Sequence, residues 1–249
     1  MPLQLLCWGN TDVGRKRDHN EDCYLINRRM GLVVVADGMG GHAGGELASR
    51  IAVEIIDREL GAAHGEEGAA PSGDRFRHAI EIASQEIFRI SREVSELEGM
   101  GTTVTGLYAD GEALVLAHVG DSRAYQVRWG DVTQLSQDHS LVAEQVRSGL
   151  LTAEDAKSSR LRHIITRSVG FEADTDVDIR VVSVREGDVL VLCSDGLANH
   201  VEPDEIAHVV AAGTLPDAPR RLIALANERG GDDNITVIVS YVARAGEMD

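Results

Sequence analysis

The sequence is poor in aromatic residues and in positive charge. Phe, Trp and Tyr make up 4% of its 249 residues, too few to suggest the stacking platforms that hold single-stranded nucleic acid. Lys and Arg number 24 against 41 Asp and Glu, so the formal net charge is −17. A surface this acidic repels phosphate backbones and anionic lipid, and we therefore expect neither nucleic acid nor a membrane as a partner.

Cysteines and long apolar runs are also scarce. Cys7, Cys23 and Cys193 are odd in number and widely spaced, which predicts neither a disulfide framework nor a zinc pair. No apolar run approaches the roughly 20 residues that a membrane helix needs. The N-terminal residues do not resemble a signal peptide. Together these features predict a cytoplasmic protein.

The hydrophobic pattern predicts both helices and antiparallel strands. Helical spacing of apolar residues is present at 47–60 and 76–94, on either side of a loop at 61–73, and shorter helices are expected at 203–212 and 217–228. Strands are expected as pairs around Gly/Asp turns, at 103–109 with 113–119, 123–128 with 132–135, and 179–184 with 189–193, and as a last strand at 235–242. Such pairs imply antiparallel sheets whose faces are covered by helices.

A glycine-rich stretch follows the apolar run that begins at Val33. Gly38, Gly40 and Ala43 match the dinucleotide-binding fingerprint, which also stands between a strand and a helix. That fold needs regular alternation of strands and helices, and the paired strands argue against it.

Acidic residues lie at the ends of four predicted strands. Asp37, Asp121 and Asp195 each end an apolar run beside a glycine, and Asp232 and Asp233 precede the last strand. One such Asp is an ordinary turn residue, but four sites can bring carboxylates together. Two carboxylates about 4 Å apart repel by roughly 4 kcal/mol at an effective dielectric near 20, so a proton or a cation must join them. Oxygen ligands favour Mg²⁺ or Mn²⁺ over zinc.

This arrangement predicts hydrolysis of a phosphate ester. Two ions about 4 Å apart, bridged by one Asp, would turn a shared water into hydroxide placed for attack on phosphorus. The substrate phosphate would need an arginine fork. Arg15 and Arg17 are candidates, and Glu21 and Asp22 follow them.

Two further segments bear on this prediction. Cys23 and Arg29 have the C-x₅-R spacing of cysteine phosphatases, but the residues between them are strand-like and lack the glycines that wrap a phosphate. Residues 136–170 are polar, with a helix start expected at Thr152. We expect this segment to be an insertion beside the site.

Eight motifs, in register over nearly the whole chain, resemble the PP2C-like metal-dependent protein serine/threonine phosphatases in their compact bacterial form. They lie at residues 11–22, 36–42, 101–103, 120–123, 138–140, 165–170, 194–197 and 231–236. The resemblance implies a single catalytic domain over residues 1–249, with 136–170 as a mobile flap. The implied fold is of the α+β class, a four-layer αββα sandwich of two antiparallel sheets packed face to face and flanked by pairs of helices.

The resemblance also implies roles for individual residues. Two Mn²⁺ or Mg²⁺ ions would be held by Asp37 as the bridge, by the backbone carbonyl of Gly38, and by Asp195 and Asp233; a third, weaker ion would take Asp121 with Asp195. Arg17 would bind the substrate phosphate. Glu21 and Asp22 would orient metal-bound water.

One position departs from many eukaryotic relatives, which carry a proposed general acid, His, directly after the Asp-Gly pair. This chain has Met39 there, so the resemblance supplies no general acid. The implied substrates are phosphoproteins, the implied opponent is a cognate Ser/Thr kinase, and the implied state is a monomer. The alternative is a catalytically weak member that binds phosphoproteins or regulates, but such a protein is expected to lose metal ligands that this chain retains.

Overall fold

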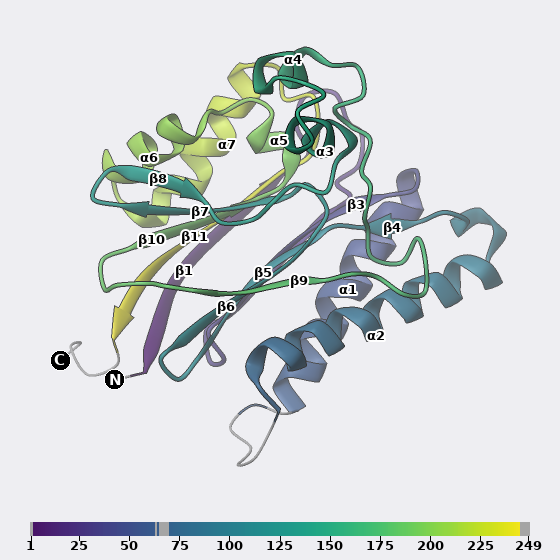
Figure 1. The fold of residues 1–249 in the computed structure, drawn as a ribbon, viewed down its shortest axis with the longest axis horizontal. Coiled ribbons are helices and arrows are strands. Elements are labelled where there is room, and N and C mark those ends of the chain that lie inside the picture. The colour runs from purple at the N-terminus through teal and green to yellow at the C-terminus, as the bar shows by residue number, and fades with distance from the viewer. Residues whose placement is uncertain (1, 63, 65–69, 245–249) are drawn as a thin grey trace.

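Two antiparallel sheets lie between two pairs of helices in the computed structural model, which describes residues 2–62, 64 and 70–244 (Figure 1). The first sheet has the order β1 (Leu3–Asp12), β11 (Ile235–Arg244), β10 (Val189–Cys193), β7 (Arg123–Arg128) and β8 (Asp131–Gln134). The second has the order β2 (Asp22–Asn27), β3 (Leu32–Met39), β5 (Val104–Asp110), β6 (Ala113–Val119) and β9 (Asp178–Val182), with β4 (Gly101–Thr102) paired to β3. The predicted four-layer α+β sandwich is confirmed.

Each sheet carries its own pair of helices on its outer face. These are α1 (His42–Ala62) and α2 (Ser72–Glu93) on the second sheet, and α6 (Pro203–Ala211) and α7 (Ala218–Glu228) on the first. Phe76, Ile80 and Ile87 of α2 are fully buried, as the helical spacing predicts. Within the predicted loop at 61–73, residues 63 and 65–69 lie outside the described residues. Among the described helices, none combines the length and apolar character needed to cross a bilayer.

Central strands are buried on both faces. In β3, Val33 and Val35 point into the core between the sheets, whereas Leu32 and Val34 pack against the helices. A strand buried in this way needs apolar residues at consecutive positions. The same reason explains the apolar runs that end at Asp121 and Asp195.

Two of the three predicted hairpins are confirmed, since β5 pairs with β6 and β7 pairs with β8. The third prediction is wrong, because β9 pairs with β6 in the second sheet and β10 pairs with β7 and β11 in the first. The chain between them crosses from one sheet to the other. Asp188 holds this crossover, accepting hydrogen bonds from the Arg185 backbone and the Arg128 side chain at 2.7–2.8 Å.

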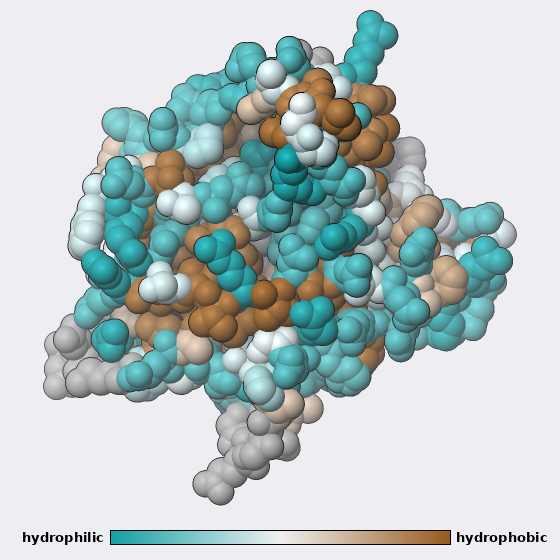
Figure 2. All heavy atoms as spheres, viewed as in Figure 1, coloured by the Kyte–Doolittle hydropathy of each residue, from teal (hydrophilic) through white to brown (hydrophobic). Residues whose placement is uncertain are grey.

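The 136–170 segment contains two short helices, α3 (Leu141–Arg147) and α4 (Ala153–Ser158). The side chain of Thr152 caps α4, as predicted. Isolated bridges tie Ser140 to Ile165 and Thr102 to Val169, so both ends of the segment are fixed to the sandwich or to each other. Figure 2 shows apolar atoms exposed over α3 and α4, where 78% of Leu150 is accessible.

Three smaller helices complete the described chain. They are the 3₁₀ turns η1 (Ser95–Leu97) and η2 (Leu215–Asp217) and the single turn α5 (Asp195–Ala198).

Candidate active site

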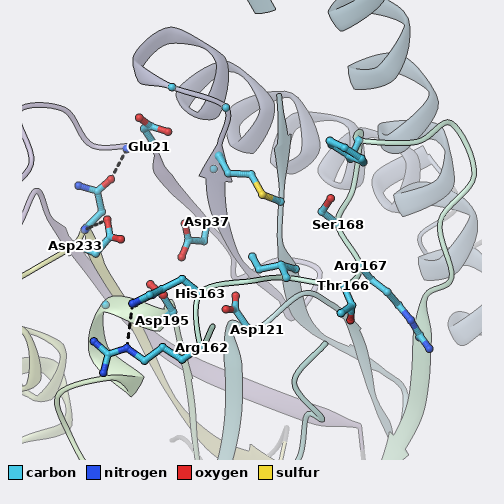
Figure 3. Close-up of a pocket in the computed structure, with 18 of the residues that line it drawn as sticks. Glu21, Asp37, Asp121, Arg162, His163, Thr166, Arg167, Ser168, Asp195 and Asp233 are labelled. Atoms are coloured by element: carbon cyan, nitrogen blue, oxygen red, sulfur yellow. Dashed lines mark hydrogen bonds between the residues drawn. The ribbon is translucent and has the colours of Figure 1, made fainter. Parts of the chain in front are cut away.

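Carboxylates from both sheets meet at one end of the sandwich. Asp37 lies near the end of β3, Asp121 follows β6, and Asp195 follows β10, while Asp233 precedes β11. Because β10 and β11 are antiparallel neighbours, the end of one lies beside the start of the other. All four aspartates line one cavity of about 1600 Å³. Figure 3 shows the side chains of Asp37, Asp121 and Asp195 pointing into the same space.

Burial and mutual repulsion shift the pKa values of the carboxyl groups in this cavity. Burial and then the charges of Asp22, Asp195, Asp121 and Asp233 raise the pKa of Asp37 well above its usual range. Burial and then the charge of Asp195 raise the pKa of Asp121 to about 8. Burial and the charge of Asp233 likewise raise the pKa of Asp195. Groups held in this way favour a proton or a cation among them.

The turn after Asp37 requires glycine because other chain segments approach it closely. A Cβ on Gly38 would lie 2.1 Å from the carbonyl oxygen of Gly45 and 2.5 Å from that of Glu21. The Gly38 backbone N–H also donates to the Glu21 carbonyl at 3.1 Å. The glycines therefore allow α1, the Glu21 loop and β3 to meet beside Asp37.

Asp22 is a neighbour of Asp37 but is not among the residues that line the cavity. It lies opposite Asp37 in the β2–β3 register, and its Oδ2 accepts a hydrogen bond from Ser194 Oγ at 2.8 Å. Its Oδ1 is buried and has no hydrogen-bond partner within the part of the chain that the structure describes. Burial, opposed by the Ser194 bond, raises the pKa of Asp22 to about 7. A buried carboxylate oxygen of this kind can accept a hydrogen bond from an ordered water.

Arg17 is placed over the cluster by a loop that Asn234 anchors. The Asn234 side chain accepts from the Glu21 N–H at 2.7 Å and donates to the carbonyls of Val13 and His19 at 2.9 and 2.8 Å. Arg17 itself is half exposed and donates to Asp233 Oδ2 at 2.7 Å. The guanidinium thus lies at the rim of the cavity beside a carboxylate of the cluster.

Thr103 ties the two strand ends of the second sheet together. Its hydroxyl hydrogen-bonds Ser122 Oγ at 2.7 Å and accepts from the Asp37 N–H at 3.0 Å, and its own N–H donates to the Asp37 carbonyl at 2.8 Å. The residue falls in a motif noted in the sequence, but no role was predicted for it. Nor was any role predicted for Asn234, because both act through contacts between distant segments.

Other predicted candidates lie differently. Arg15 is not among the residues that line the cavity. Asp232 lies at the rim, where it pairs with Lys16 and, at 3.4 Å, with His200. Met39 lines the cavity at the position where relatives carry His.

The 136–170 segment also contributes to the cavity wall, which the sequence did not reveal by residue. Arg162 and His163 line the cavity, and Arg162 Nε donates to His163 Nε2 at 3.0 Å (Figure 3). Their polar surroundings in the sequence gave no signal that would single them out.

The residues present fit hard divalent cations. The donor set is carboxylate oxygen, the charges repel one another, and the buried Asp22 Oδ1 awaits a donor such as ordered water. Within the described ranges, no three His, Cys, Asp or Glu side chains already stand at coordination spacing.

Cys23 does not provide an alternative nucleophile. It lies within β2, paired with Ala36, and burial raises the pKa of its thiol. A reactive cysteine needs the opposite shift.

The chain is similar to known proteins in sequence and in fold. Residues 14–226 match the family model described as protein phosphatase 2C. The chain is 37% identical over 233 residues to the serine/threonine phosphatase Stp of Listeria monocytogenes, covering 92% of each chain.

Solved structures are similar over the whole fold. The serine/threonine phosphatase PstP/Ppp of Mycobacterium tuberculosis has a TM-score of 0.86 at 33% identity, covering 97% of this chain and 100% of that one. The catalytic domain of PstP in complex with two manganese ions has a TM-score of 0.83 at 33% identity, with the same coverage.

Proposed function

The chain belongs to the protein phosphatase 2C family and is a protein serine/threonine phosphatase, and from this premise we propose that Asp37, Gly38, Asp195 and Asp233 hold a pair of Mn²⁺ or Mg²⁺ ions. The observation that carries the proposal is the convergence of buried aspartates from both sheets on one cavity. When bound, such a pair of ions would supply water that is activated near neutral pH for attack on phosphorus. Asp121, with Asp195, is proposed to hold a third, weaker ion.

The protein's own groups perform the remaining tasks in this proposal. Arg17 lies at the cavity rim and offers a guanidinium to the phosphate of the substrate, which is a dianion that planar N–H donors recognise well. Its bond to Asp233 holds it next to the reacting position. Glu21 and Asp22 orient water inside the cavity, and the free Oδ1 of Asp22 supports this role.

We propose further that phosphoproteins are the substrates and that a cognate Ser/Thr kinase opposes the enzyme. Residues 1–249 are proposed to form one catalytic domain that acts as a monomer in the cytoplasm, with 136–170 as its flap. Support for the flap is the position of Arg162 and His163 in the cavity wall. The alternative, a catalytically weak phosphoprotein-binding module, is disfavoured because the carboxylate cluster is complete.

Phosphate release from a phosphothreonine peptide tests the proposal. We expect turnover with Mn²⁺, none in EDTA, and a loss of more than about 100-fold for Asp37→Ala, since metal activation supplies several kcal/mol. Asp232→Ala is the matched control, because Asp232 lies at the rim in an ion pair with Lys16. Full activity in EDTA would reject the metal mechanism. Peptide binding with Mn²⁺ but without turnover would favour the binding module.

Arg17→Ala isolates the phosphate-binding role. We expect a higher KM for the peptide, with Arg15→Ala as the control, because Arg15 is not part of the cavity lining. Unchanged KM and kcat would remove Arg17 from the site.

A further inference from the structure

Residues at the start of the 136–170 segment form hydrogen bonds with the turn that carries Asp121. The His139 N–H donates to the Gly120 carbonyl at 2.7 Å, and the Gly120 N–H donates to His139 Nδ1 at 3.1 Å. One residue beyond Ser122, Arg123 donates to both oxygens of Asp138 at 2.7–3.1 Å. The turn on which Asp121 stands is therefore held on both sides by two consecutive residues, Asp138 and His139.

The ring of His139 has a defined proton arrangement. Because a backbone N–H can only donate, Nδ1 must be the acceptor, and the proton of the neutral ring is on Nε2. Nε2 lies 3.3 Å from Asp178 Oδ2, at the start of β9, where Arg167 also pairs with Asp178. The residue is only 3% exposed, and its ring packs against that of His118 at 4.8 Å between centroids. Burial lowers the pKa of His139, which keeps the ring neutral.

The Asp121 turn has little freedom to find another arrangement. Gly120 has φ +110°, and a Cβ there would lie 2.5 Å from Thr103 Cγ2. On its other side, Ser122 is fully buried and bonds Thr103, which in turn bonds Asp37. The orientation of Asp121 thus depends on backbone contacts, and within the described chain the Gly120 N–H donates to the His139 side chain.

His139 also joins this turn to the far end of the 136–170 segment. Its carbonyl accepts a hydrogen bond from the Thr166 N–H at 2.8 Å. Thr166 lines the catalytic cavity. One buried residue therefore contacts the turn of a proposed metal ligand and both ends of the segment that covers it.

We propose that His139 is a positioning residue that holds the Gly120–Ser122 turn in place for Asp121 and links it to the 136–170 segment. The proposal rests on the role proposed above for Asp121. His139 does not contact substrate or metal. It acts through the Gly120 N–H, so any side chain that offers an acceptor at the Nδ1 position should preserve much of the effect.

Three substitutions of His139 test this in the full chain. The Asn side-chain oxygen occupies roughly the place of Nδ1, whereas Gln places its amide beyond it and Ala has no acceptor. Binding of Mn²⁺ is followed through the electron paramagnetic resonance signal of the free ion, without substrate. We expect His139→Ala and His139→Gln to weaken the weakest Mn²⁺ site by about ten-fold or more, as loss of an outer partner of a metal ligand does. His139→Asn should stay close to wild type.

Two control substitutions distinguish a positioning role of His139 from a nonspecific loss of structure. Asp178→Asn alters the Nε2 side alone and should leave Mn²⁺ binding within about three-fold of wild type, well below the effect of losing an outer partner. Asp121→Ala removes the ligand itself, and adding His139→Ala to it should change Mn²⁺ binding no further, because the two changes act at one site. Thermal unfolding identifies any variant that has lost its fold. If His139→Ala is such a variant, Mn²⁺ binding by His139→Asn and His139→Gln is compared instead.

The outcomes are distinct. Binding by His139→Ala identical to wild type, equal weakening of every Mn²⁺ site, or additive effects with Asp121→Ala would each overturn the positioning role. If wild type binds no Mn²⁺ and hydrolyses the peptide in EDTA, it is the proposed function that fails.

Discussion

Asp188 and Asp195 lie at opposite ends of strand β10, and the surroundings of the two carboxylates shift their pKa values in opposite directions. Asp188 precedes the strand, is 2% exposed, and receives four hydrogen bonds from Arg128, Gln126 and the Arg185 backbone at 2.7–2.9 Å. Although burial raises its pKa, the Arg128 bonds outweigh that effect and lower it. Asp195 follows the strand among other carboxylates, and its pKa is raised.

The difference shows where the fold supplies a counter-charge and where it does not. At the Asp188 end, an arginine from β7 neutralises the carboxylate and closes the crossover between the sheets. At the Asp195 end, the carboxylate accepts a hydrogen bond from the neutral Asn199 at 3.0 Å and lies among other carboxyl groups. We infer that the first carboxylate is there for stability, and that the second keeps its charge for a cation at the expense of stability.

The largest effect that would test this contrast is expected for Asp195→Asn. The substitution keeps the shape and removes one negative charge, so peptide hydrolysis should fall more than about 100-fold because a proposed metal ligand is lost. Stability in EDTA should rise by about 1 kcal/mol, since like charges no longer repel. Phosphate release measures the loss of hydrolysis, and urea unfolding in EDTA measures the change in stability. A variant that is less stable in EDTA than wild type would contradict the contrast.

Asp188→Asn should show the reverse pattern. The free energy of unfolding should fall by about 2 kcal/mol, below the range for a fully buried pair because the Arg128 side chain is 26% exposed. Peptide hydrolysis and Mn²⁺ binding should remain within about two-fold of wild type, in the range of a site that does not touch the chemistry. Urea unfolding with Mn²⁺ and with EDTA makes the comparison, and a hundred-fold loss of turnover would show that the two ends are not independent.

The pH dependence of that stability difference follows from the lowered pKa of Asp188. A carboxylate whose pKa is lower in the folded than in the unfolded protein stabilises the fold above its ordinary pKa, and this stabilisation is lost as the pH falls through the folded value. Wild type should therefore exceed Asp188→Asn in stability at pH 7, and the gap should close below about pH 4. Urea unfolding of both proteins across this range is the measurement. A gap that widens in acid would give the wrong sign.

Strand order along the chain was predictable only where pairing is local. Gly111 and Gly130 each stand in a two-residue turn between consecutive paired strands, and those hairpins were predicted correctly. Gly187 and Asp188 look the same in the sequence, yet the strands around them belong to different sheets. The deciding contacts of Asp188 are to Arg128, 60 residues earlier in the chain, and to Val242 of β11, 54 residues later, and no local pattern encodes them.

The residues of the candidate site also differ in how far the local sequence predicts them. Asp37, Asp121, Asp195 and Asp233 carry a local signal, an acidic residue at the end of an apolar strand, and the structure brings them into one cavity. Thr103, Asn234 and His139 lie in motifs noted in the sequence, but their local patterns indicate no individual role. Each is a common polar residue whose importance lies in hydrogen bonds to segments remote in the sequence. Sequence patterns thus point to ligands more readily than to the residues that position them.

The smallest expected effect on the contrast between the two ends of β10 is that of a substitution at Gly187, beside Asp188. Gly187 has φ +90° and open space around the position of a Cβ, whereas a Cβ on Gly196, beside Asp195, would lie 2.0 Å from the Asn234 carbonyl oxygen. The first glycine serves backbone conformation alone, and the second serves close packing of the site. Gly187→Ala should therefore lower the free energy of unfolding by about 1 kcal/mol and leave turnover unchanged.

Gly187→Asn is the matched control, because Asn tolerates positive φ and should recover part of that loss. Urea unfolding and phosphate release decide the matter. If Gly187→Ala reduced turnover ten-fold while remaining folded, the crossover end of β10 would be coupled to the catalytic end. The separation of stability from chemistry along this strand would then be lost.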